Sequence, residues 1–205
     1  MSRYTGPRLK VMRALGVDLP GLSRKSMQER NYPPGQHGMR KASGRKSGFG
    51  LQLMEKQKLR YNYGLSETQL RRVVMDAKKQ RGATGENIVG ILERRLDNLV
   101  FRAGFAPTIP AARQLVNHGH IQLNGRRVTI ASVRVRVGDS FGPTEAGKKM
   151  DMVRATLESP ALDRPEWVAL DSVSHTARLT YLPGGDAAPF PLDMQRVVEY
   201  YATRI

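Results

Sequence analysis

Residues 95–104 of the chain read Arg-Leu-Asp-Asn-Leu-Val-Phe-Arg-Ala-Gly, residues 111–119 read Ala-Ala-Arg-Gln-Leu-Val-Asn-His-Gly, and residues 120–128 read His-Ile-Gln-Leu-Asn-Gly-Arg-Arg-Val. The first two stretches are short, basic and apolar at helical spacing, and a glycine at the end of each is typical of a helix C-terminus. Asn124-Gly125 between two short runs is the strongest short-range signal for a β-hairpin. The segment therefore predicts two short helices followed by a tight hairpin.

The charge around this segment is strongly positive. Residues 94–137 hold eight arginines and one aspartate, and the chain of 205 residues has a net charge of +16 and a pI of about 10.7. Residues 1–60 form a second basic block, with 14 Lys and Arg against 3 Asp and Glu, whereas residues 138–205 hold 7 against 10. So basic a chain needs a polyanionic partner, and packed helices with a hairpin favour RNA. The plainer alternative is a solvated charged face.

Several classes of protein are disfavoured by composition. The chain contains no cysteine, which removes disulfides, thiol catalysis and cysteine zinc sites, and fits a reducing cytoplasm. It has no run of about 18 apolar residues that could span a membrane, and no apolar signal core follows Met1. The lysines and arginines of residues 38–50 lack the apolar face that a membrane-surface helix needs. We therefore expect no membrane partner.

The N-terminal 50 residues show little periodicity. They contain Pro33-Pro34-Gly35 and a run rich in Gly, Ser, Lys and Arg from Gly38 to Gly50. The apolar residues are too few to bury much, so we expect a basic arm that becomes ordered mainly on its partner. A short helix over Lys10–Leu15, ended by Gly16, is the one element expected there.

Helical signals dominate residues 51–104. Residues 51–63 are rich in helix formers, and Ser66 with Gln69 forms a capping box that opens a second helix. Further helices are expected from Thr84 and before Gly104. The apolar positions at helical spacing predict the buried faces of these three helices: Leu70, Val73, Val74 and Ala77; Ile88, Ile91 and Leu92; Leu96, Leu99 and Val100.

The second half of the chain mixes strands and helices. After the helix Ala111–His118, the alternation of Val133, Val135 and Val137 with arginines predicts a half-exposed strand. A helix is expected from Glu145 to about Leu157 and another over Met194–Ala202. Residues 167–170 and 177–182 are typical of a strand pair.

Three features invite other functions. Arg95-Leu96-Asp97 is similar to a tripeptide of pseudouridine synthases, but an aspartate at helical spacing from Val100 is better explained by pairing with a nearby arginine. His118 and His120 lack a neighbouring Cys or carboxylate that would complete a metal site. His37 has no Ser, Cys or acid placed to form a triad, so a turn clamped to phosphate is the better account.

The helix–helix–hairpin order and the amino-acid sequence of this segment closely resemble the small RNA-binding module called the S-four domain. The flanks extend this resemblance to the bacterial-type family of the fourth small-subunit ribosomal protein over nearly the whole chain. They are, in chain order, Arg3-Tyr4, Gly6-Pro7, the Pro-Gly-Gln-His-Gly of residues 34–38, residues 52–58, Tyr63-Gly64, Thr84-Gly-Glu-Asn of residues 84–87 and residues 198–201.

This resemblance implies a fold and a function. The fold is α+β and mostly helical: a basic arm over residues 1–50, a discontinuous helical body over 51–93 and 158–205, and an S-four-type module over 94–157 inserted between them. The function is structural: the family binds the five-helix junction in the 5′ domain of 16S rRNA, nucleates subunit assembly, contacts the fifth small-subunit protein and influences decoding accuracy. No catalysis, cofactor or metal is implied. The alternative is an RNA-modifying or tRNA-acting enzyme that carries the same module.

The residues expected to face rRNA are carried over from the family motifs. In the arm and the first long helix they are Arg3, Tyr4, Lys10, Gln36, His37, Gly38, Arg40, Lys41, Arg45, Lys46, Lys56, Lys58 and Arg60. In the module they are Arg95, Asn98, Arg102, Arg113, Gln114, His118, His120 and Asn124. Residues 40–46 also correspond to the part of the family that lines the path by which mRNA enters.

The chain departs from the family pattern at three points. Some members carry a cysteine zinc knuckle in the arm, which the absence of Cys excludes here. Ile109-Pro110 stands where members often have a basic residue, and Met54 replaces a usual Arg. One phosphate contact is expected to be lost at each of the last two positions.

Overall fold

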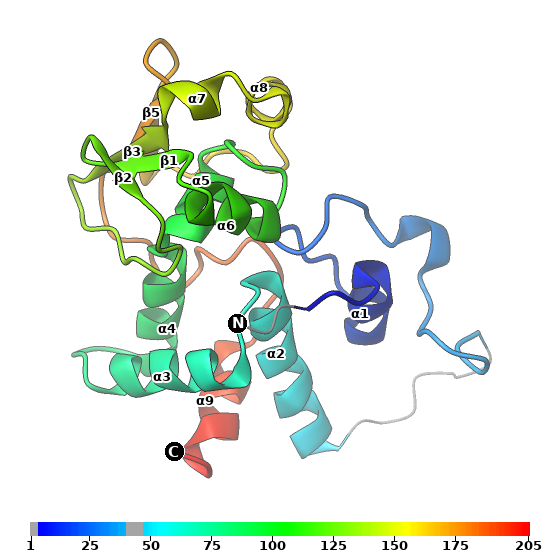
Figure 1. Cartoon of the computed structure of the whole chain (residues 1–205). Coiled ribbons are helices and arrows are strands. Elements are labelled where there is room, and N and C mark those ends of the chain that lie inside the picture. Colours follow the sequence, from blue (N-terminus) through cyan, green and yellow to red (C-terminus); the bar gives the residue numbers. More distant parts are fainter. Residues whose placement is uncertain (1–3, 40–46) are drawn as a thin grey trace. The chain divides into compact units, whose positions relative to one another are not determined.

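The computed structural model describes residues 4–39 and 47–205, and within them the chain forms two compact units. Unit 1 contains the described residues up to Ile88 together with Ala188–Ile205, and unit 2 is Val89–Ala187. The helices are α1 (Arg8–Leu15), the 3-10 turn η1 (Gln28–Arg30), α2 (Gly48–Asn62), α3 (Glu67–Lys78), α4 (Thr84–Glu93), α5 (Leu96–Arg102), α6 (Ile109–Asn117), α7 (Glu145–Lys148), α8 (Asp151–Glu158) and α9 (Met194–Ala202). The strands are β1 (Ile121–Leu123), β2 (Arg126–Val128), β3 (Ser140–Pro143), β4 (Val168–Asp171) and β5 (Thr176–Leu179). Figure 1 shows this order in colour along the chain.

Unit 1 is built around α2, α3 and α9, with α2 and α9 side by side. The capping box expected at the start of α3 is present: Gln69 N–H donates to Ser66 Oγ at 3.2 Å, and Ser66 N–H donates to Gln69 Oε1 at 3.0 Å. The predicted apolar face of α3 is buried, as are Val197 and Tyr201 of α9. Local capping and periodicity thus position the helices as expected.

The N-terminal segment corrects one prediction. Val11, Met12, Val17, Leu19 and Leu22 are all buried, and α1 packs against α2. Gly21 N–H also donates to the buried Asn62 Oδ1 at 2.9 Å. The expectation that this region has too few apolar residues to bury much was wrong, because these five side chains are buried although their spacing is irregular. The helix before Gly16 was confirmed, and Gly16 has the left-handed φ of 69° that suits it as a cap.

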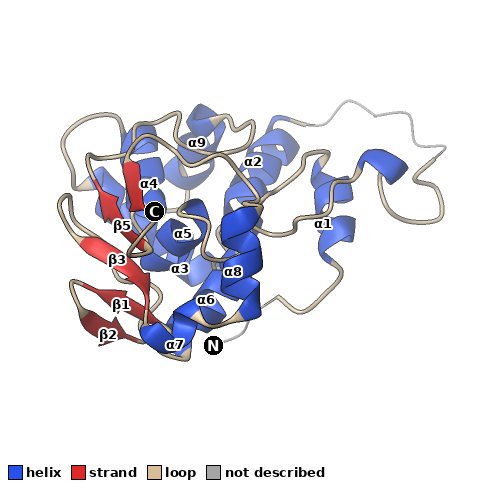
Figure 2. Ribbon diagram, turned by 90° about the horizontal axis from the view of Figure 1, so that it is seen from above, coloured by secondary structure: helices blue, strands red, loops and turns tan. Residues whose placement is uncertain are grey.

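Unit 2 contains an antiparallel sheet in the order β2-β1-β3-β5-β4, with α5 and α6 packed against each other (Figure 2). The Asn-Gly hairpin is confirmed, since Leu123 pairs with Arg126 and residues 124 and 125 have φ of 50° and 75°. Positive φ at both positions is what a type I′ turn requires. The expected strand pair is β4–β5, and β5 pairs with β3. The sheet therefore extends beyond residue 157, where we had placed the end of the module.

Two expected elements of unit 2 were wrong. Residues 133–137 form no regular strand. The carbonyls of Val133 and Ala131 cap α5 instead, with Leu96 N–H donating to Val133 O at 2.9 Å and Asp97 N–H donating to Ala131 O at 3.1 Å. These are the free N–H groups of a helix start, which must find acceptors. The single helix expected from Glu145 is two, α7 and α8, because Met150 is extended, with ψ of 128°.

Candidate nucleic-acid interface

Asp97 lies fully buried at the start of α5 in unit 2. Arg95 donates to both of its oxygens, from Nε to Oδ1 at 3.1 Å and from Nη2 to Oδ2 at 2.9 Å. Arg113 of α6 adds Nε and Nη2 contacts to Oδ2 at 3.0 and 2.6 Å. Asp97 thus ties α6 to α5, and its pairing with arginine, preferred above over a catalytic role, is confirmed.

Glu93 at the end of α4 gathers a second set of partners. Its Oε2 accepts from Asn98 Nδ2 at 2.9 Å and from Arg102 Nε at 3.1 Å. Arg102 Nη2 also donates to the Ala187 carbonyl at 2.6 Å, and its guanidinium lies 5.4 Å from the centroid of the Trp167 ring. We call Glu93, Arg95, Asp97, Asn98, Arg102 and Arg113 together the buried ionic network.

This network changes the expectation for three predicted RNA contacts. Arg95, Asn98 and Arg102 are only 7%, 1% and 6% exposed, and each donates side-chain hydrogen bonds within unit 2. Buried arginines with carboxylate partners hold helices together. Arg113 is half-buried and shares Asp97. The first helix of the segment is therefore braced internally, whereas we had expected it to face RNA.

The remaining predicted residues of unit 2 are accessible. Gln114 and His118 are exposed, and His120 is half-buried with its ring 6.3 Å from that of His118. Asn124 is exposed, but its side chain braces the hairpin: Nδ2 donates to Asp139 Oδ1 at 2.9 Å, and Oδ1 accepts from Ser140 N–H at 2.8 Å. The hydrogen bond from Asn124, followed by one from the Arg136 backbone, holds the pKa of Asp139 below its ordinary value.

Four arginines that were not among the predicted RNA contacts are exposed in unit 2. We call Arg126, Arg127, Arg134 and Arg136 the basic hairpin face. Arg127 Nη2 donates to the His118 carbonyl at 3.1 Å, and Asp139 accepts from both Asn124 and the Arg136 N–H, which links the hairpin tip to the loop after it. The alternation of arginine with valine at 133–137 was the signal for this face, since its polar positions were expected to point outward.

Arg94 lies beside this face and is half-buried. Burial lowers the pKa of Arg94, and the positive charge of Arg134 lowers it further. Two guanidiniums near each other repel, and a phosphate placed beside them relieves that repulsion. The electrostatics of this part of unit 2 therefore favour an anion.

In unit 1, the predicted residues fall into two groups. Tyr4, Lys10, Gln36 and His37 are exposed, and Gly38 is buried in a turn where a Cβ would overlap the Pro33 carbonyl oxygen. Lys56 is 4% exposed and pairs with Glu67 at 2.7 Å, and Lys58 pairs with Glu55 at 2.7 Å. Arg60 is half-buried. Arg3, Arg40, Lys41, Arg45 and Lys46 lie outside the described residues.

Within residues 4–39 and 47–205, no three His, Cys, Asp or Glu side chains gather so that they could hold a metal ion. None of the helices described is both long and apolar enough to cross a membrane.

The chain matches two known families along its length. Residues 3–93 match the family described as ribosomal protein S4/S9 N-terminal domain, and residues 94–141 match the S4 domain. The chain is 58% identical over 205 residues to the small ribosomal subunit protein uS4 of Methylobacillus flagellatus, with both chains covered completely. It is 49% identical to the protein of the same name from Synechococcus elongatus, again with full coverage of both. A ribosomal protein uS4-like chain from Azoarcus sp. BH72 is 82% identical over 108 residues, which are 53% of this chain and 94% of that one.

Proposed function

Because this chain belongs to the uS4 family of small ribosomal subunit proteins, we propose that it binds the five-helix junction in the 5′ domain of 16S rRNA and helps to nucleate assembly of the subunit. The family consists of structural ribosomal proteins and not of enzymes, so the modifying-enzyme alternative is not retained. The observation that carries the proposal is the basic hairpin face, four exposed arginines on one small unit.

The mechanism follows from the contrast between this face and the buried network. Phosphate neutralisation by exposed arginines supplies affinity that falls steeply with salt. Bidentate guanidinium contacts fix the position of the RNA backbone. The network ties α5 to α6, so that the exposed side chains sit on a rigid support, and rigid placement is what recognition of RNA by its shape requires.

The exposed residues of the first unit extend the proposal. Tyr4, Lys10, Gln36 and His37 are exposed basic and polar residues of the N-terminal segment. We propose that this segment and residues 40–46 contact the same RNA, with residues 40–46 also lining the path by which mRNA enters. The fifth small-subunit protein is the proposed protein partner, and residues 138–205 hold more acidic than basic residues, with 7 Lys and Arg against 10 Asp and Glu.

The test is binding of the purified chain to a transcript of the 5′ domain of small-subunit rRNA. The competitor is an RNA of equal length whose junction is disrupted by base changes, and both are measured over a series of salt concentrations. We expect strong preference for the intact junction and a steep salt slope. Equal affinity for the two RNAs at every salt concentration would leave only non-specific attraction to phosphate and would overturn the proposal.

A further inference from the structure

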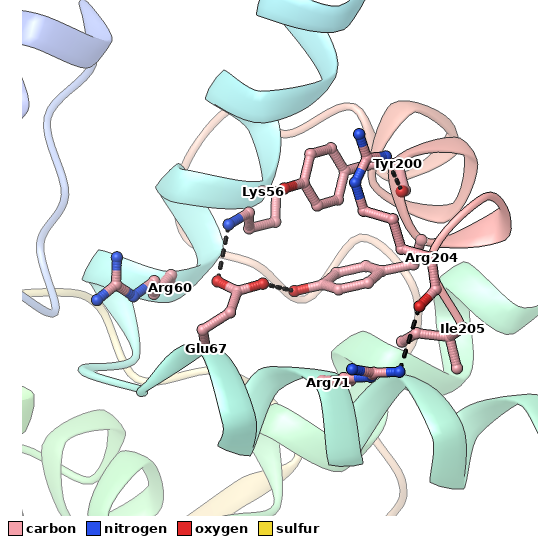
Figure 3. Close-up of a pocket in the computed structure, with 8 residues that line it drawn as sticks. Lys56, Arg60, Glu67, Arg71, Tyr200, Arg204 and Ile205 are labelled. Atoms are coloured by element: carbon pink, nitrogen blue, oxygen red, sulfur yellow. Dashed lines mark hydrogen bonds and ion pairs between the residues drawn. The ribbon is translucent and has the colours of Figure 1, made fainter.

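A pocket of about 430 Å³ opens between α2, α3 and α9 in unit 1, away from the hairpin in sequence. Figure 3 shows its side chains, with Glu67 in the centre, Arg60 at one end, and Arg71 and Arg204 at the other. Its charged side chains are four cations, Lys56, Arg60, Arg71 and Arg204, and one carboxylate, Glu67. The remaining lining is Tyr200, Tyr201 and Ile205.

The single side-chain carboxylate of the pocket is already fully engaged. Glu67 Oε2 accepts from Lys56 Nζ at 2.7 Å, and Oε1 accepts from the Tyr201 hydroxyl at 2.8 Å. Burial acts to raise the pKa of Glu67, but the hydrogen bonds from Lys56 and Tyr201 outweigh it and hold the pKa below its ordinary value. Glu67 and Lys56 therefore neutralise each other, and the charges of the three arginines are left over.

Two of the three arginines, Arg71 and Arg204, are held in place by groups that carry no charge. Arg71 Nη2 donates to the Arg204 carbonyl at 3.3 Å. Arg204 stacks 4.2 Å from the Tyr200 ring centroid and donates to the Tyr200 carbonyl at 2.8 Å. Among the described residues, the buried Nε of Arg60 has no hydrogen-bond partner. A buried donor without an acceptor is costly, so this nitrogen favours an incoming acceptor.

We propose that this pocket binds a phosphorylated ligand that carries at least two phosphate groups. Arginines at opposite ends suit a chain of phosphates better than one small anion, and guanidinium forks match phosphate oxygens. Tyr200 already contacts Arg204 and Lys56, so its ring is occupied and the pocket recognises phosphate and not a stacked base. The phosphates can belong to an RNA strand or to a free polyphosphate.

The test is calorimetric titration of the full chain with inorganic tripolyphosphate. The Arg60→Gln/Arg71→Gln double variant is expected to bind about tenfold more weakly or worse, since two charge-assisted contacts are lost. Arg72→Gln/Arg81→Gln is the matched control, because it removes the same charge from exposed positions of α3 and the loop after it that do not line the pocket. Equal loss in both variants, or no binding by the wild type, would overturn the proposal.

A second variant keeps the proposal testable if the double variant fails to fold. Glu67→Gln removes the one carboxylate and frees Lys56 for the ligand, so the affinity for tripolyphosphate should rise several-fold. A folded Glu67→Gln chain with unchanged or weaker binding would contradict the proposal. A polyglutamate peptide that binds as tightly as tripolyphosphate, with the same dependence on Arg71, would replace phosphate by an acidic peptide and also overturn it.

The source of the phosphate is identified by a competition experiment. Tripolyphosphate is titrated into the chain already saturated with the 5′-domain transcript. If the transcript excludes tripolyphosphate from the wild type, an RNA strand occupies the pocket. If both bind together, the pocket takes a free phosphorylated molecule.

Discussion

Arginines of the same segment have opposite fates in unit 2. Arg95 and Arg102, at the two ends of α5, are buried with Asp97 and Glu93 as partners. Arg126 and Arg127, about 25 residues later by number, stand exposed on β2. A buried arginine and an exposed arginine add the same charge to the net charge of the segment. Only the exposed pair, however, is accessible to phosphate. A count of arginines therefore overstates the size of an RNA-binding surface.

The difference has a physical cause. Taking an arginine out of water costs several kcal/mol unless a carboxylate and further hydrogen bonds compensate it. Asp97 is shared by two arginines, and Glu93 by one arginine and an asparagine. Asp97 and the preceding Glu93 can compensate only a limited set of buried cations, and the other arginines of the segment remain at the surface.

The largest expected effect on stability comes from removing a carboxylate of the buried ionic network. Glu93→Gln leaves Arg102 buried without its countercharge, and the free energy of unfolding should fall by about 3–5 kcal/mol. Urea denaturation monitored by circular dichroism measures it. Glu145→Gln is the control, because Glu145 pairs with Lys148 while its side chain is 84% exposed, and a much smaller loss is expected there because solvent screens the pair. Similar losses in the two variants would show that the network contributes no more than a surface pair.

Substitution of the exposed arginines should weaken RNA binding and leave stability nearly unchanged. Arg126→Gln/Arg127→Gln should weaken binding to the 5′-domain transcript by roughly tenfold or more and reduce the slope of log affinity against log salt by about 1.4–1.8, since two phosphate contacts are lost. Stability should change by only about 0.5 kcal/mol per site. Arg154→Gln/Arg164→Gln, also exposed in unit 2, is the control. If both double variants lower the affinity and the slope equally, the basic hairpin face has no special role.

How much of this contrast could be read from the sequence depends on the range of the interactions. The capping box of Ser66 and Gln69 and the Asn124-Gly125 turn act over two or three residues, so their outcome was predicted correctly. The burial of Arg102 depends on Glu93, nine residues away, and on the carbonyl of Ala187, 85 residues away. No local pattern encodes those contacts.

The missed elements have the same origin. The valines of residues 133–137 have strand periodicity, but their backbone caps α5, a demand that arises only after the chain has folded back. Gly21 bonds to Asn62 across 41 residues, so the fold of the N-terminal segment was likewise hidden from a local analysis. Exposed arginines were inferred from helices and found on the hairpin and its loop, since tertiary contacts decide which cations stay in water.

Substitution of Asn124 in the hairpin turn should have an intermediate effect on stability. Asn124→Ala places alanine at φ of 50° and removes the hydrogen bonds to Asp139 and Ser140, so a loss of about 1–2 kcal/mol is expected. Asn124→Gly tolerates the same φ and loses only the hydrogen bonds, so it should cost less. Thermal unfolding of both variants tests the order. A glycine variant as unstable as the alanine variant would assign the whole effect to the side-chain bonds.

The smallest expected effect is the pH dependence of Asp139, which joins the hairpin tip to the following loop. Hydrogen bonds from Asn124 and from the Arg136 backbone hold its pKa in the folded chain below the unfolded value of about 3.9. A depressed pKa contributes stability that is present above the unfolded value and is lost as the pH falls through the folded value. Wild type and Asp139→Asn should therefore differ by a constant amount above about pH 5 and converge below that range. A difference that persists undiminished at the most acidic pH would mean that the Asp139 carboxylate does not brace the hairpin through its charge, and that the exposed arginines are held by the turn alone.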